Sequence, residues 1–271
     1  MYPILFHWGP ITLHTYGLLA ALGFLAGYAL ASRRAKQAGL PSSLVGDALT
    51  PLVISGIVGA RIFYVVFHGS EFAGAWLDTL KIWQGGLMWQ GGFLGALTAL
   101  AVFARNKKVP FWLLADLFAP AAALGQAVGR VGCLFAGCCF GHGCTLPWAI
   151  TFRHSESLAP VGVPLHPTQL YDAGLNLLIC FILLRVAWGK PIGSVSANQA
   201  SQKSGENTFI GSGRIAGLYL VMAGLARLAV EPFRADARGT GVGLFSATGL
   251  VALGLVLAGT GLTLWTYRRA K

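Results

Sequence analysis

Long apolar runs are the feature of this sequence that most restricts how the chain can fold. Each run approaches the roughly 20 residues that an α-helix needs to cross the hydrocarbon core of a bilayer. The runs cover Thr12–Ala31, Gly46–Phe67, Leu87–Ala104, Phe111–Phe135, Pro167–Trp188, Arg214–Val230 and Val242–Tyr267. The sequence therefore predicts an all-α, polytopic membrane protein with seven transmembrane helices, organised as one integral-membrane domain over residues 1–271.

The composition supports this class. Of the residues, 55% are hydrophobic and 11% are charged, with a mean hydropathy of +0.65, whereas a soluble domain carries about 25% charge. A transmembrane barrel would need alternating strands of about ten residues, but these runs are continuous. The net charge of +11 does not indicate a nucleic-acid partner, because basic residues of membrane proteins concentrate in cytoplasmic loops.

The basic residues also predict the orientation. If the loop after the first run is cytoplasmic, the inner side holds 13 of the 20 Lys and Arg residues: Arg33, Arg34, Lys36, Arg105, Lys107, Lys108, Arg185, Lys190, Lys203, Arg214, Arg268, Arg269 and Lys271. This bias places the N-terminus outside and the C-terminus in the cytoplasm. The polar segment over 189–213 is rich in Ser, Asn and Gln and is predicted to be a flexible linker. An irregular segment over Ala136–Leu165 is expected on the outer face.

Three arginines lie inside apolar runs, toward their predicted outer ends: Arg61, Arg130 and Arg227. An embedded charge is costly and needs a partner or a function, and Arg is suited to bidentate phosphate recognition. Glu231 follows Arg227 by four residues and can pair with it on one helical face. Only Glu231 and Asp172 are acids at this depth, too few for three arginines. Interhelical salt bridges are one interpretation; an anionic ligand such as a lipid phosphate is the other.

The stretch GQAVGRVGCLFAGCCFG at residues 125–141 contains a cluster of cysteines. Cys133, Cys138 and Cys139 lie in it, and Cys144 follows closely. The spacing is not a recognised zinc pattern, which requires paired ligands such as C-x₂-C. Free thiols, a disulfide that joins Cys144 to Cys138 or Cys139, and a metal site all stay open.

Six short motifs follow one another along the chain. They are HTYG at 14–17, GARI at 59–62, WQGG at 83–86 followed by Gly91-Gly92, GRVG at 129–132 closing at Gly137 and Gly141, HPTQLY at 166–171, and Arg227 with VEPFR at 230–234. In this order and spacing the motifs resemble those of the phosphatidylglycerol–prolipoprotein diacylglyceryl transferase family, from about residue 7 to the C-terminus.

The resemblance implies an enzyme of the bacterial cytoplasmic (inner) membrane. It would transfer the diacylglyceryl group of phosphatidylglycerol to the thiol of a lipobox cysteine in a preprolipoprotein and release glycerol 1-phosphate. Its partners would be phosphatidylglycerol, the lipobox segment and the bilayer, with no nucleic acid. The chemistry needs no metal or cofactor, because fixed positive charge can bind the phosphodiester and stabilise the leaving phosphate.

The resemblance also implies roles for single residues. The expected catalytic residues are Arg130, Arg227 and Glu231. The expected substrate-binding residues are Tyr16, Arg61, Gln90, Gly141, His166 and Gln169. For His166 a capping or interfacial role is an equal alternative to lining the site.

Four positions depart from the family pattern. Gln90 stands where many members carry a His and cannot act as a general base; Cys133 replaces an Asn, Cys138 a Glu, and Ala223 a Tyr. These changes leave room for a paralogue that binds anionic lipid without catalysis or acts on another acceptor. Embedded arginines also suit a transporter or channel, but charges confined to the outer half argue against a continuous anion path.

Overall fold

The structure is a computed structural model, and it describes residues 2–8, 11–41, 43–72, 74–82, 85–188, 211–235 and 246–269. The predicted linker over 189–213 lies almost entirely outside the described residues.

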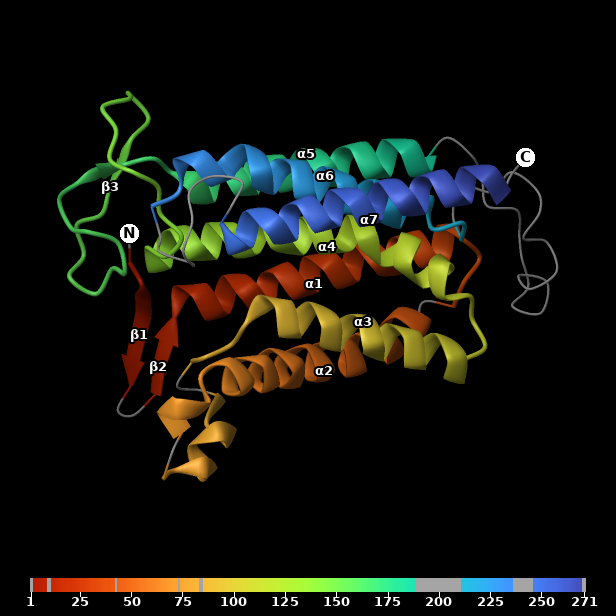
Figure 1. Cartoon of the computed structure of the whole chain (residues 1–271), viewed down its shortest axis with the longest axis horizontal. Helices are drawn as coiled ribbons and strands as arrows, with labels where there is room; N and C mark the ends of the chain where they lie inside the picture. Colours follow the sequence, from red (N-terminus) through yellow and green to blue (C-terminus); the bar gives the residue numbers. More distant parts are fainter. Residues whose placement is uncertain are drawn as a thin grey trace.

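The described residues form seven α-helices that run along the long axis of the molecule (Figure 1). Their bounds are α1 Thr15–Gln37, α2 Ser43–Phe67, α3 Trp89–Asn106, α4 Phe111–Ala136, α5 Thr168–Trp188, α6 Arg214–Val230 and α7 Ala247–Arg269. Six of these helices, all except α3, are long and apolar enough to cross a membrane. The prediction of a polytopic helical membrane protein is therefore confirmed, and the helices lie where the apolar runs predicted them.

Helix α3 differs from the other six. Its 18 residues extend about 27 Å at a rise of about 1.5 Å per residue, slightly less than the roughly 30 Å of a hydrocarbon core. Polar residues also reduce its apolar length, since Gln90 lies in the first turn and Arg105 in the last. Length and composition alone thus support six spans.

An N-terminal β-hairpin replaces the predicted start of the first span. Strands β1 (Ile4–Trp8) and β2 (Ile11–His14) pair antiparallel, and α1 begins only at Thr15. The apolar–polar alternation of β2 fits a strand better than a helix. The Thr15 amide donates to the Pro3 carbonyl at 2.9 Å, which fastens the hairpin to the end of α1.

The helices pack as a row with a separate pair. Helix α4 lies between α1 and α5, α6 packs against both α5 and α7, and α2 pairs with α3 (Figure 1). Leu183 and Ile215 are fully buried where α4, α5 and α6 meet. In the α2–α3 pair the backbones approach so closely that a Cβ on Gly91 would overlap the Gly59 carbonyl. Small residues permit such contacts between membrane helices.

Apolar side chains also cover much of the outer surface of the bundle. Phe24, Leu25 and Leu257 are 56%, 61% and 66% exposed. Large exposed apolar surfaces are unusual on soluble monomers and mark contact with a membrane or a partner. Here they lie on helices long enough to span a bilayer. The apolar faces are therefore surfaces that contact lipid.

The segment between α4 and α5 is folded rather than wholly irregular. Strands β3 (Ile150–Thr151) and β4 (Pro164–Leu165) pair antiparallel, and Phe152 and Leu165 are buried in a small core of their own. This segment, the β1–β2 hairpin and the 3₁₀ helices Gly69–Phe72 (η1) and Trp76–Leu80 (η2) gather at one end of the bundle, opposite the end of α7 (Figure 1). A third 3₁₀ turn, Glu231–Phe233 (η4), follows α6.

Candidate active site

Arg227 and Glu231 form an ion pair at the end of α6. The Arg227 Nη2 atom lies 2.6 Å from Glu231 Oε2, which confirms the pairing predicted from the four-residue spacing. The other carboxylate oxygen accepts hydrogen bonds from Ser246 Oγ, at 2.6 Å, and from Thr248 Oγ1. Glu231 is thus fixed by residues from both sides of the α6–α7 connection, and it orients Arg227.

The second guanidinium nitrogen of Arg227 has no such partner. Its Nη1 atom is buried and makes no hydrogen bond to any residue that the structure describes. A buried donor without an acceptor costs about 1–3 kcal/mol, more when it is charged. An orphaned charged N–H in an apolar bundle is therefore a candidate position for a ligand acceptor.

Asp172, in the first turns of α5, joins two further arginines. Its carboxylate is 4% exposed, and its Oδ2 atom lies 3.3 Å from Arg130 Nε and 3.4 Å from Arg234 Nη1. Asn176, one turn later, donates to the Asp172 carbonyl at 2.8 Å. One carboxylate is therefore shared by two guanidiniums that come from α4 and from the segment after α6.

These five charged groups leave a surplus of positive charge. Three arginines (Arg130, Arg227 and Arg234) face two carboxylates (Asp172 and Glu231), so the cluster carries one positive charge more than its acids neutralise. A hollow of about 50 Å³ lies beside it, lined by Gln126, Arg130, Asp172, Asn176, Ala223, Ala226 and Arg227. This hollow is smaller than a lipid head group, so it suits the anionic end of a ligand rather than the whole molecule.

Arg61 does not join this cluster, and its substrate-binding role stays a prediction. Its Nε donates to the Thr79 carbonyl at 2.8 Å and its Nη2 to the Asp78 carbonyl at 2.7 Å. Its Nη1 donates to the carbonyls of Gly85 and Gly86, at 2.8 and 3.2 Å. All three nitrogens are occupied because the α2–α3 connection folds over the end of α2. Arg234 is the third arginine of the cluster instead.

Gly141 and Gln169 lie in packed positions that support the neighbouring segments, and their substrate-binding roles stay predictions. The Gly141 amide donates to the His166 carbonyl at 3.1 Å, and a Cβ there would meet the Phe233 carbonyl at 2.5 Å. Gln169 is fully buried, and its Nε2 donates to the Cys138 carbonyl at 2.8 Å. Both residues hold the segment between α4 and α5 against its neighbours.

Tyr16, His166 and Gln90 lie at three different places near this end of the bundle. Tyr16, at the start of α1, is 47% exposed and packs beside Gly132 of α4. His166 Nδ1 lies 3.2 Å from Tyr171 Oη, and its ring packs against Phe233 at 5.2 Å between centroids. Gln90 is half-buried in the first turn of α3. Substrate-binding roles for these three stay predictions.

All five cysteines, each of them described by the structure, are free thiols. The Sγ atoms of Cys133, Cys138 and Cys139 lie within 4.8 Å of one another, and Cys144 stays outside this group. A disulfide from Cys144 to Cys138 or Cys139 is therefore not formed. The pKa of the Cys138 thiol is raised, chiefly by hydrogen bonding with the two neighbouring thiols and then by burial.

Asp172, Asn176 and Arg234 are the residues of the cluster that sequence reasoning did not assign. A usable signal existed for the first two. Asp172 is the single acid of an apolar run, and Asn176 follows it at four residues, on the same helical face. Nothing in the sequence showed that Arg234 turns back toward α5.

The fold and the cluster define a multi-pass helical membrane protein with a net-positive arginine site at one end of its bundle. The family model described as prolipoprotein diacylglyceryl transferase matches residues 3–265, nearly the whole chain. This chain belongs to that family.

Individual relatives agree over most of their lengths. The chain is 34% identical to the phosphatidylglycerol–prolipoprotein diacylglyceryl transferase of Parasynechococcus marenigrum, over 99% of this chain and 95% of the relative. It is 35% identical to the protein of the same name from Trichormus variabilis, over 99% and 91%. For that of Vibrio cholerae the identity is 32%, over 98% and 92%.

Proposed function

We propose that this chain transfers the diacylglyceryl group of phosphatidylglycerol to the thiol of a lipobox cysteine in prolipoproteins and releases glycerol 1-phosphate. The family membership and the names of its relatives support the substrates. The observation that carries the proposal is the arginine cluster, with one positive charge in surplus and a buried Arg227 Nη1 atom without a partner among the described residues.

In this proposal Arg130 and Arg227 bind the phosphate of the lipid. The lipobox thiol gives its proton to solvent, the thiolate attacks the glyceryl carbon, a C–S bond forms, and the C–O bond to the phosphate breaks. The bonding electrons remain on the phosphate oxygen, so negative charge grows where the guanidiniums lie. Stabilisation of charge that develops in the transition state raises the rate more than equal binding of the ground state does.

Glu231 acts on Arg227 rather than on the substrate. Both of its oxygens are engaged, by Arg227 on one side and by Ser246 and Thr248 on the other. A carboxylate held in this way is a poor proton acceptor but a firm support for the guanidinium that it faces. Asp172 holds Arg130 and Arg234 in the same manner.

We also infer that all seven helices cross the bacterial cytoplasmic membrane as one domain, with the arginine cluster on the outer side. The basic residues at the end of α7 support a cytoplasmic C-terminus. The hairpin at the N-terminus and the end of α7 lie at opposite ends of the bundle (Figure 1), as an odd number of spans requires. A periplasmic reporter active after Lys271 would contradict this orientation.

The direct test is transfer of labelled diacylglyceryl from phosphatidylglycerol to a lipobox peptide by purified variants at equal folded amounts. Arg130→Ala is expected to lose about 10²–10³ in rate, as for removal of one transition-state donor. Arg130→Lys keeps the charge but loses the planar fork, so its rate also falls sharply.

Arg185→Ala is the matched control, because Arg185 lies near the other end of α5 with its guanidinium over the Phe181 ring at 4.7 Å. Its transfer rate is expected to stay near wild type. Wild-type protein that binds phosphatidylglycerol but transfers nothing would favour a lipid-binding paralogue. Near-normal transfer by Arg130→Ala would remove the phosphate-clamp mechanism.

A further inference from the structure

Three thiols meet beside the arginine cluster without a role in the transfer described above. Cys133 lies in the last turn of α4, and Cys138 and Cys139 follow the end of that helix. Their Sγ atoms all lie within 4.8 Å of one another, and Cys139 is buried. Three sulfur donors this close together can coordinate one metal ion. A single cysteine cannot form such a site.

The backbone that carries two of these thiols is held firmly. The Cys139 carbonyl accepts from Thr168 Oγ1 at 2.7 Å, and the Cys138 carbonyl accepts from Gln169 Nε2 at 2.8 Å. Thr168 and Gln169 are both fully buried. The start of α5 therefore holds the loop through hydrogen bonds that are shielded from water.

Cys139 also adopts a left-handed backbone conformation, with φ of 61°. Non-glycine residues rarely occupy this region, and they persist there only where the surroundings impose it. In this conformation the Sγ atom of Cys139 lies within 4.8 Å of that of Cys133 in the last turn of α4. The convergence of the three sulfurs is thus a built feature of the loop.

We propose that Cys133, Cys138 and Cys139 form a three-thiolate binding site for a soft monovalent metal ion, with Cu(I) as its occupant. Metal–thiolate bonds of about 2.3 Å place three sulfurs in a plane about 4 Å apart, and the three sulfurs here lie within 4.8 Å of one another. Thiolates select soft ions such as Cu(I) and Zn(II). Structural zinc takes four protein ligands, whereas no fourth His, Cys, Asp or Glu joins the group among the described residues.

Binding exchanges three protons for one ion. Each S–H bond gives its proton to solvent, three Cu–S bonds form, and copper stays in the Cu(I) state, so no oxidant or reductant is needed. Affinity is therefore expected to increase as pH rises, since ligand thiols must be deprotonated.

Occupancy would also change the charge beside the lipid site. Three thiolates and one Cu(I) ion carry two negative charges, and Cys133 lies one helical turn from Arg130 on α4. This charge offsets the positive surplus of the arginine cluster. We therefore expect Cu(I) to weaken phosphate binding and to inhibit transfer; this consequence rests on the proposed function, whereas the metal site does not.

The test is a titration of the reduced, full-length protein with Cu(I) under anaerobic conditions, in competition with a chromophoric Cu(I) chelator. Wild type is expected to take up one ion per chain. Cys133→Ser and Cys138→Ser should each weaken uptake by more than about 10-fold, because even outer-shell changes cost about 10–100-fold in metal affinity. Cys144→Ser, in the same loop but outside the group, and Cys180→Ser, buried in α5, should bind as wild type does.

A second measurement keeps the proposal testable if the serine variants do not fold. In wild type, Cu(I) should protect Cys133 and Cys138 from alkylation, read by mass spectrometry, and should leave Cys144 open. No stoichiometric uptake by wild type, uptake that depends on Cys144, or preference for Zn(II) over Cu(I) would overturn the site. Uptake without inhibition of transfer would leave the site standing and would overturn only its coupling to the arginine cluster.

Discussion

Arg61 and Arg227 look alike in the sequence, since each lies near the end of an apolar run, yet their surroundings differ completely. All three guanidinium nitrogens of Arg61 donate hydrogen bonds, and four backbone carbonyls of the α2–α3 connection accept them. Arg227 meets one carboxylate and keeps a buried Nη1 atom without a partner among the described residues. The difference teaches that an embedded arginine is structural when fixed acceptors fill its donors, and a ligand site when they do not.

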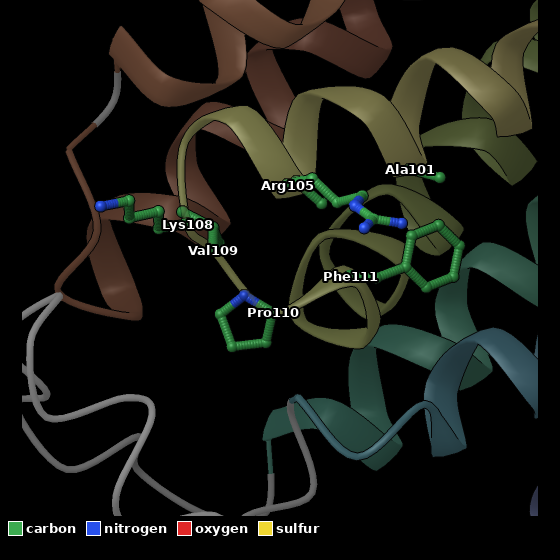
Figure 2. Close-up of a pocket in the computed structure, with 7 residues that line it drawn as sticks. Ala101, Arg105, Lys108, Val109, Pro110 and Phe111 are labelled. Atoms are coloured by element: carbon green, nitrogen blue, oxygen red, sulfur yellow. The ribbon is translucent and has the colours of Figure 1, made fainter.

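A hollow at the α3–α4 connection shows that size alone does not identify a site. It measures about 460 Å³, far more than the hollow beside Arg227, and it is lined by Arg105, Lys108 and Phe111 among others. Figure 2 shows Arg105 extending toward Phe111 while Lys108 points away from both. Both cations are exposed, so water satisfies them and no ligand is required.

The largest effect is expected from removal of the carboxylate that two arginines share. Asp172→Ala leaves the buried Arg234 and the partly buried Arg130 without their shared carboxylate, and loss of one partner of a buried pair costs about 3–5 kcal/mol. The free energy of unfolding in mixed micelles measures this loss. Asp47→Ala is the control, because its pair with Lys107 at 2.9 Å is about half exposed and worth about 0–1 kcal/mol. Equal losses for the two variants would contradict the buried network.

Arg61→Ala should separate stability from activity. Hydrogen bonds from a charged group contribute about 1.5–3 kcal/mol, so the unfolding free energy should fall by about that amount or more. Transfer per folded molecule should stay close to wild type, because each guanidinium nitrogen of Arg61 already donates to a backbone carbonyl of the α2–α3 connection. A loss of transfer at full stability would place Arg61 in the site after all and remove the contrast with Arg227.

Glu231→Gln should lower activity less than Arg130→Ala does. The amide keeps the shape of the side chain but loses the charge that orients Arg227, and we expect about a tenfold loss in kcat/KM, or about 1.4 kcal/mol. A rise in KM for phosphatidylglycerol larger than the fall in kcat would show that Glu231 acts through lipid binding. An unchanged KM with a pH profile shifted by one ionisation would instead indicate a proton-transfer role.

Gln90→Ala should have the smallest effect of the series. An amide cannot accept the thiol proton at neutral pH, so only a hydrogen bond worth about 0.5–1.5 kcal/mol can be lost. Steady-state transfer kinetics measure this change. A loss as large as that of Arg130→Ala would show that α3 contributes directly to the reaction. Gln90 would then belong to the active site.

Sequence reasoning reached the helices more reliably than the site. Continuous apolar runs predicted α6 at its observed bounds, Arg214–Val230, because spans are set by local composition. The sequence also predicted the Arg227–Glu231 pair, because residues four apart on a helix lie on the same face. Contacts within one helix join residues that are close in the sequence, so residue spacing alone predicts them.

The parts that were missed depend on chain reversal. The partners of Arg61 are backbone carbonyls, which every residue has and no motif marks. Arg234 reaches Asp172 because the chain turns after α6. The three thiols converge in a loop where Cys139 has the left-handed conformation that sequence does not announce for a non-glycine residue. The first span was predicted to begin at Thr12, so it took in Thr12–His14 of strand β2, which are not helical.

The central claim is that the arginine cluster of α4 and α6, and not Arg61, binds the phosphate of the lipid. Native mass spectrometry of delipidated protein, offered equal amounts of phosphatidylglycerol and phosphatidylcholine, tests it most directly. Wild type and Arg61→Ala should each retain one phosphatidylglycerol molecule in preference to phosphatidylcholine. Folded Arg227→Ala should show no preference between the two lipids. Retained preference in Arg227→Ala together with its loss in Arg61→Ala would contradict the account.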